Sequence, residues 1–124
     1  MGNTLEKIIQ DKKETLNLIK KNNSLDSLEK KIKNLNFFNN FKKAIQNNKG
    51  ISLISEIKKA SPSAGVLVEN FNHLNIAKMY IDNGSTCLSV LTEEKHFLGK
   101  LDYITDIKNK YKIRFSDFII FAGV

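Results

Sequence analysis

Apolar residues recur at helical spacing through the first 49 residues of the chain. Over residues 4–20 they form one approximate stripe between lysines and acids, made of Leu5, Ile8, Ile9, Leu16 and Ile19. Ser24 is a typical N-cap residue and predicts a second helix, whose apolar side carries Leu25, Leu28 and Ile32. A third, aromatic-rich helical face is predicted from Phe37, Phe38, Phe41, Ala44 and Ile45. The pattern therefore indicates a helical N-terminal segment.

From Gly50 onward the spacing changes to short β-rich runs. These runs predict strands at 51–57, 86–91 and 113–121, with helices at 73–83 and at about 100–110 between them. The order strand, helix, strand, helix, strand, with short connections, indicates parallel strands joined by right-handed crossovers. We therefore expect an α/β fold in which residues 1–49 form a helical extension and residues 50–124 carry about three parallel strands.

The composition is that of one soluble globular domain or less than one. The chain has 124 residues, of which 41% are hydrophobic and 27% are charged. No apolar run approaches the roughly 18 residues of a membrane span, and the charged N-terminus does not resemble a secretory signal. Cys87 is the single cysteine and lies in an apolar run, so we expect a buried, inert thiol and a cytoplasmic protein that contacts no membrane.

The formal net charge of +7 is concentrated at the N-terminal end. Residues 1–50 carry 11 Lys against 5 acids, whereas residues 51–124 have a net charge of +1. All but one of the 20 basic residues are lysine, which lacks the planar fork with which arginine reads phosphates and base edges. This favours a solvated helical surface, so nucleic acid is not the expected partner. A basic helical module that binds RNA or another polyanion remains the alternative.

Candidate chemistry begins at the end of the first predicted strand, with Glu56 and Lys58. Because side chains alternate along a strand, these two residues are expected to project to the same face. Ligands of parallel α/β folds bind at the carboxyl ends of the strands, which is where this pair falls. The pair is therefore a candidate active site, and a strand end that has simply reached solvent is the alternative.

The loops after the first two strands carry further polar groups. The loop 61–65 offers hydroxyls and amides that could hold an anion, or forms an ordinary turn. The loop 92–96 holds Glu93, Glu94, Lys95 and His96, but adjacent side chains point apart, so we predict no metal site. His73 stands at a predicted helix start and is expected to be a capping or surface residue. The chain contains no Gly-rich phosphate-binding pattern.

Three segments of the chain resemble successive strand signatures of indole-3-glycerol-phosphate synthase, a lyase of tryptophan biosynthesis. They are SEIKKASPSAG at residues 55–65, CLSVLTEEKHFLG at residues 87–99 and DFII at residues 117–120. The resemblance runs nearly end to end and includes the helical N-terminal extension. It implies that the strands belong to a (β/α)8 TIM barrel.

The resemblance also implies an activity and a set of site residues. The family converts carboxyphenylamino-deoxyribulose phosphate to indole-glycerol phosphate, with ring closure and loss of carbon dioxide and water, and it uses neither a metal nor an organic cofactor. Glu56 would be one of the catalytic carboxylates, and Lys58 would pair with the substrate carboxylate. Ser61 would contact the substrate, while Phe97 and Phe118 would form walls of the pocket for the aromatic ring.

The sequence departs from the family pattern in three respects. Ser116 stands where the family has the lysine that acts as its general acid, and Ala64 stands where a lysine is common. Residues 121–124 replace the expected polar continuation. The chain also offers three strands, whereas a TIM barrel closes with eight. We therefore expect the N-terminal part of such an enzyme, truncated or frameshifted near the third strand and inactive alone, or else a half-barrel scaffold completed by a second chain.

Overall fold

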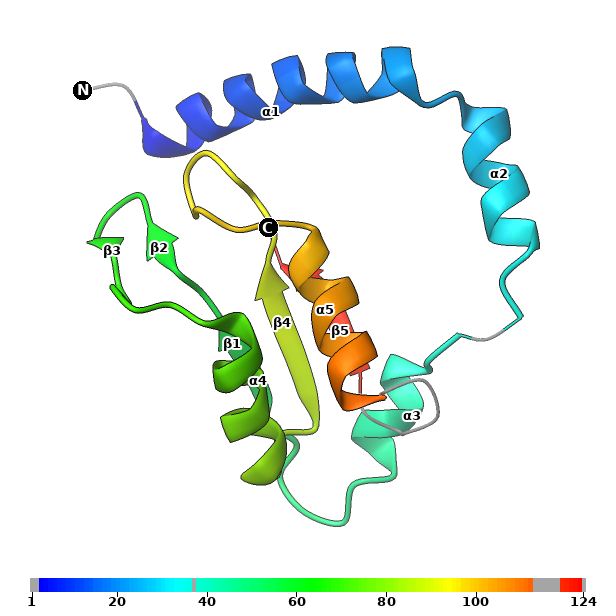
Figure 1. Cartoon of the computed structure of the whole chain (residues 1–124), viewed down its shortest axis with the longest axis vertical. Helices are drawn as coiled ribbons and strands as arrows, with labels where there is room; N and C mark the ends of the chain where they lie inside the picture. The colour runs from blue at the N-terminus through cyan, green and yellow to red at the C-terminus, as the bar shows by residue number, and fades with distance from the viewer. Residues whose placement is uncertain (1–2, 37, 113–118, 124) are drawn as a thin grey trace. The chain divides into compact units, whose positions relative to one another are not determined.

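The computed structural model describes residues 3–36, 38–112 and 119–123, with the last stretch described by its backbone only. The chain divides into two compact units, Met1–Phe38 and Asn39–Val124. The first unit contains α1 (Thr4–Asn22) and α2 (Leu25–Lys33), which confirms the first two predicted helices (Figure 1). The predicted N-cap is also confirmed, since Ser24 Oγ accepts a hydrogen bond from the Ser27 amide at 3.2 Å. Neither helix contains a buried residue.

The second unit begins with α3 (Phe41–Gln46), which is shorter than the sequence predicts. Its start is fixed by Asn40, whose side chain accepts a hydrogen bond from the Lys43 amide at 2.9 Å. Phe38 therefore precedes the helix and is exposed, so its predicted place on the helical face was wrong. Phe37 lies outside the described residues. Ala44 is the buried residue of this helix.

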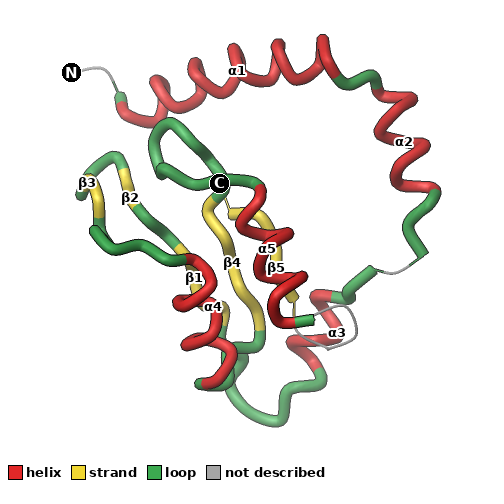
Figure 2. Tube along the Cα trace, viewed as in Figure 1, coloured by secondary structure: helices red, strands yellow, loops and turns green. Residues whose placement is uncertain are grey.

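A parallel sheet forms the centre of the second unit. It consists of β1 (Ile54–Ile57), β4 (Cys87–Leu91) and β5 (Ile119–Gly123) in the order β1-β4-β5. Both neighbouring pairs are parallel. The connections contain α4 (His73–Asp82) and α5 (Asp102–Tyr111). This arrangement confirms the predicted α/β order, and Figure 2 shows the alternation along the chain.

Two details of the strands differ from the sequence prediction. The first strand starts at Ile54, because side chains take up backbone groups before it: the Asn48 side chain donates to the Ile51 carbonyl, and the Leu53 amide donates to Thr86 Oγ1. The loop after β1 contains a small antiparallel hairpin of β2 (Ala60–Ser61) and β3 (Gly65–Val66). The third strand is described at 119–123, and residues 113–118 of its predicted range lie outside the described residues.

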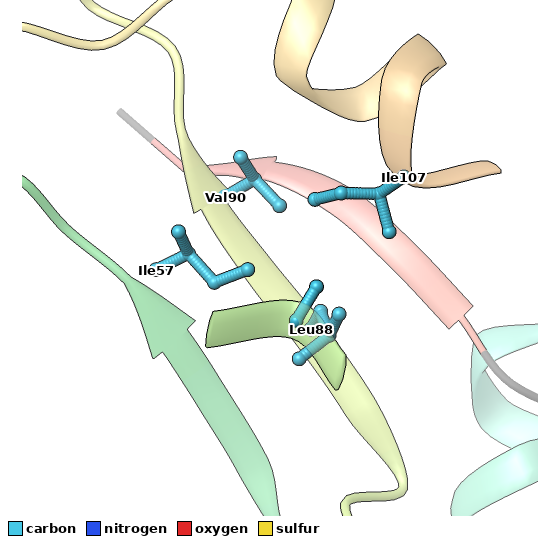
Figure 3. Packing of buried hydrophobic residues seen from close by; sticks show 5 residues of the cluster. Ile57, Leu88, Val90 and Ile107 are labelled. Atoms are coloured by element: carbon cyan, nitrogen blue, oxygen red, sulfur yellow. The ribbon is translucent and has the colours of Figure 1, made fainter. Parts of the chain in front are cut away.

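The hydrophobic core lies between the sheet and the two crossover helices. It consists of Ile57, Leu88 and Val90 from the strands with Ala77 and Ile107 from the helices, all at most 1% exposed (Figure 3). Complete burial of a side chain the size of leucine stabilises a fold by about 1.5–3 kcal/mol. One face of the sheet is therefore buried against α4 and α5.

The other face of the sheet is built differently. Cys87 alternates with Leu88 along β4, and it packs against Ala44 of α3 at the amino-terminal end of the strand. The predicted buried thiol is confirmed, and burial raises the pKa of the Cys87 thiol, which keeps it protonated and inert. Helix α3 thus packs near the strand starts and leaves the strand ends to the loops. Among the described helices, none combines the length and apolar character that a bilayer span requires.

Candidate functional site

Glu56 and Lys58 stand at the carboxyl end of β1, on the sheet face turned away from α4 and α5. Ile57 between them belongs to the core (Figure 3), so by strand alternation its two neighbours point to the opposite face. Lys58 Nζ lies 2.7 Å from Glu56 Oε1. The predicted common face of the two residues is therefore confirmed.

The ion pair is accessible to a ligand. The side chain of Glu56 is 47% exposed and that of Lys58 is 31% exposed. An ion pair with this exposure contributes at most about 1 kcal/mol to stability. A ligand carboxylate can therefore replace Glu56 as the partner of Lys58 at little cost. The geometry offers a cation that can hold a carboxylate beside an acid that can exchange a proton.

Ser61 lies in the hairpin that follows this pair. Its Oγ accepts a hydrogen bond from the Ala64 amide at 3.2 Å, which closes the turn between β2 and β3. Gly65 follows with a φ of +67°, a left-handed conformation that favours glycine. The Ala64 amide is thus used inside the turn, whereas a hydroxyl that accepts one bond still has its own proton to donate. Ser61 can therefore serve a ligand as a donor.

The loop after β4 is organised by Glu93. Its carboxylate accepts hydrogen bonds from the backbone amides of Lys95, His96 and Phe97 at 3.0, 2.6 and 3.1 Å. Burial by itself raises the pKa of Glu93, but these three bonds and the nearby His96 outweigh it, so the pKa lies below its ordinary value. The sequence pattern does not predict this role, because it offers Glu93 only as a possible metal ligand.

Phe97 is half-buried within the same loop, next to a close approach between loop and strand. The Gly99 amide donates to the Glu93 carbonyl at 2.8 Å. A Cβ atom on Gly99 would lie only 2.2 Å from the carbonyl oxygen of Leu91, the last residue of β4. The glycine of the sequence motif is therefore required for the loop to fold back on the strand end.

Other expected positions contribute less to this site. Phe118 and Ser116 lie outside the described residues. Asn72 rather than His73 caps α4, and His73 Nε2 lies 2.9 Å from Asp106 Oδ2 on α5. The His73 ring also stacks on Tyr103, with ring centroids 4.2 Å apart. Within the described ranges, no three metal-ligating side chains are grouped closely enough to hold an ion.

These features define a class of protein. A parallel sheet with crossover helices on one face, and a charged pair and two loops at its carboxyl end, is the arrangement found in α/β barrels. The model of the family described as indole-3-glycerol phosphate synthase matches residues 5–122. The chain belongs to this family, whose fold is the TIM barrel.

Individual relatives support the same assignment. Indole-3-glycerol phosphate synthase of Desulforamulus reducens is 43% identical over 118 residues, covering 94% of this chain and 44% of the relative. The protein of the same name from Clostridium acetobutylicum is 44% identical over 119 residues, covering 94% of this chain and 45% of the relative. That of Aliarcobacter butzleri is 41% identical over 122 residues. The chain thus spans a little under half the length of these curated relatives.

Proposed function

We propose that this chain supplies the first catalytic groups of an indole-3-glycerol-phosphate synthase, a carboxy-lyase of tryptophan biosynthesis. The observation that carries the proposal is the Glu56–Lys58 pair, accessible at the carboxyl end of β1 in a chain of this family. The proposed substrate is the phosphorylated carboxyphenylamino-deoxyribulose, and the products are indole-glycerol phosphate, carbon dioxide and water. The proposed compartment is the cytoplasm, where the single buried thiol of Cys87 stays reduced.

Each proposed residue has a distinct task in this reaction. The Lys58 ammonium holds the substrate carboxylate while the aromatic carbon bonds to the carbonyl carbon of the sugar, whose oxygen takes a proton from the family's general acid and becomes a hydroxyl. Carbon dioxide then leaves and returns its bonding electrons to the ring. Glu56 gives a proton to this hydroxyl, which departs as water, and takes one from the neighbouring sugar carbon as the indole double bond forms. Ser61 donates a hydrogen bond to the substrate, and Phe97 and Phe118 enclose its aromatic ring. These steps need an acid, a base and side chains that hold the substrate in place, and they need no organic cofactor or metal.

We further propose that residues 1–124 do not turn over substrate by themselves. Ser116 occupies the position of the family's general-acid lysine, and a neutral hydroxyl cannot replace an ammonium group as a proton donor. The strands β1 and β5 form the two edges of the described sheet. Edge strands present unpaired backbone groups, so a segment carrying the other barrel strands is the proposed partner.

An activity assay tests this proposal. The purified chain is incubated with the carboxyphenylamino substrate, alone and after co-production with a segment carrying the remaining barrel strands of the Clostridium acetobutylicum relative. We expect indole-glycerol phosphate from the pair that carries Ser116→Lys, because it has both the remaining strands and the general acid. The pair that keeps Ser116 should be much slower, and the chain alone should form no product. Turnover by the chain alone at the rate of a complete synthase would overturn the proposed dependence on a partner.

The lysines of the N-terminal helices do not require a polyanion as their partner. Lys20 and Lys21 lie in the last turn of α1, and the last turn of α2 holds Lys30, Lys31 and Lys33. Cations at these positions stabilise helix carboxyl ends through the helix dipole. Binding of RNA or another polyanion is therefore not proposed.

A further inference from the structure

We propose that Glu93 is the positioning residue of the loop 92–99, and that it fixes Phe97 for contact with the substrate ring. The inference rests on the proposed function for the role of Phe97. The role of Glu93 itself rests on the described geometry of the loop. Glu93 does not act on the reacting atoms; it determines where a neighbouring aromatic side chain stands.

The side chain of Glu93 joins the first half of the loop to the second. One carboxylate oxygen accepts from the His96 amide at 2.6 Å and from the Phe97 amide at 3.1 Å. The other accepts from the Lys95 amide at 3.0 Å. An ionised carboxylate is acceptor-only and forms shorter, stronger hydrogen bonds than a neutral group. The backbone of Phe97 is therefore held directly by a charge that lies four residues earlier.

The main chain closes the same loop at its far end. The Glu93 carbonyl accepts from the Gly99 amide, and Gly99 lies against the carbonyl of Leu91 with no room for a Cβ atom. Leu98 between Phe97 and Gly99 has a φ of +53°, a conformation uncommon for a residue with a branched side chain. Such a conformation persists only where surrounding contacts determine it. Glu93 provides contacts at both ends of the stretch that contains Phe97.

The neighbouring acid provides a matched control. Glu94 carries the same carboxylate one position along the loop and is exposed. The three amide bonds all go to Glu93. The other charged or titratable groups of the loop are Lys95 and His96, and the charge of His96 favours the ionised form of Glu93. Glu93→Gln and Glu94→Gln each remove one negative charge from the loop. The two variants therefore differ only in whether the lost carboxylate is the one that accepts the three amide hydrogen bonds.

Nuclear magnetic resonance of the full chain tests the assignment. Backbone amide signals of Lys95, His96 and Phe97 are followed from pH 7 to pH 3. We expect them to shift together with a midpoint below 4.5, the ordinary glutamate value. In Glu93→Gln this shift is lost, and amide hydrogen exchange at His96 and Phe97 becomes at least about tenfold faster, as loss of a charge-assisted hydrogen bond requires. Glu94→Gln leaves both readouts unchanged.

Anthranilate, the aromatic part of the proposed substrate, is then added to each chain. Movement of the Phe97 signals in the unmodified chain and in Glu94→Gln, but not in Glu93→Gln, is the expected result. Amide signals that do not follow the Glu93 titration would overturn the positioning role. So would an anthranilate response of the Phe97 signals that is present in the unmodified chain and equally large in Glu93→Gln. If the amides follow Glu93 but anthranilate moves no Phe97 signal in any chain, the proposed pocket fails and the loop assignment holds. The titration of the unmodified chain decides the loop assignment even if the variant does not fold.

Discussion

At the scale of single residues, the candidate site has two parts. Strand alternation places Glu56 and Lys58 on one face, and the fold of the loop after β4 places the contacts of Glu93. The common face of Glu56 and Lys58 follows from their spacing, and it could be predicted from the sequence. The role of Glu93 could not, because its three bonds go to backbone amides whose positions depend on the folded loop. The available signal was an acid two residues after a buried strand, with a glycine six residues later.

The Glu93 carboxylate gives stability a pH dependence with a definite sign. Its folded-state pKa is lower than its unfolded-state value near 4.5. The contribution of this group to stability is therefore complete above pH 4.5 and is lost as the pH falls through the folded-state pKa. Urea unfolding of the chain between pH 6 and pH 3 measures this loss. The slope of the unfolding free energy with pH should be smaller in Glu93→Gln and unchanged in Glu94→Gln; equal slopes in all three chains would contradict the assignment.

At the scale of elements, apolar periodicity predicted α4, α5 and the parallel strands, because their apolar positions are the ones that the core buries. Leu88 and Val90 pack on the same side of β4 against α4 and α5, as alternation requires. The β2–β3 hairpin was not predicted, because two residues per strand carry no periodic signal and its turn depends on the left-handed Gly65. The start of α3 was misplaced because the Asn40 cap outweighs the aromatic residues before it.

The core between the sheet and the crossover helices makes a second stability prediction. Leu88 is fully buried, whereas Met79 on α4 is 58% exposed. Leu88→Ala should lower the free energy of unfolding by about 2–5 kcal/mol, because it removes packed methyl groups and leaves a cavity. Met79→Ala serves as the exposed control and should change it by less than about 0.5 kcal/mol. Chemical denaturation measures both values, and similar losses for the two variants would show that α4 and α5 do not cover the sheet as described.

At the scale of the whole molecule, the described residues follow the layout of an α/β barrel. One sheet face packs against helices, α3 packs near the strand starts, and the polar groups gather at the carboxyl ends. The sequence allowed this layout to be predicted through the resemblance of its strand signatures. It could not specify which strands pair with β1 and β5, the two edges of the described sheet.

The most direct measurement compares two adjacent lysines in the assembly of this chain, carrying Ser116→Lys, with the segment that supplies the remaining barrel strands. Lys58→Met removes the ammonium that lies 2.7 Å from Glu56, whereas Lys59→Met removes the same charge one residue further, outside the pair. If Lys58 holds the substrate carboxylate, its loss should lower kcat/KM for the carboxyphenylamino substrate by about 10²–10³, the cost of one electrostatic catalytic group. Lys59→Met should retain kcat/KM within about twofold, as expected of a charge outside the site. Equal activity in the two variants would contradict the assignment of the Glu56–Lys58 pair as the catalytic centre.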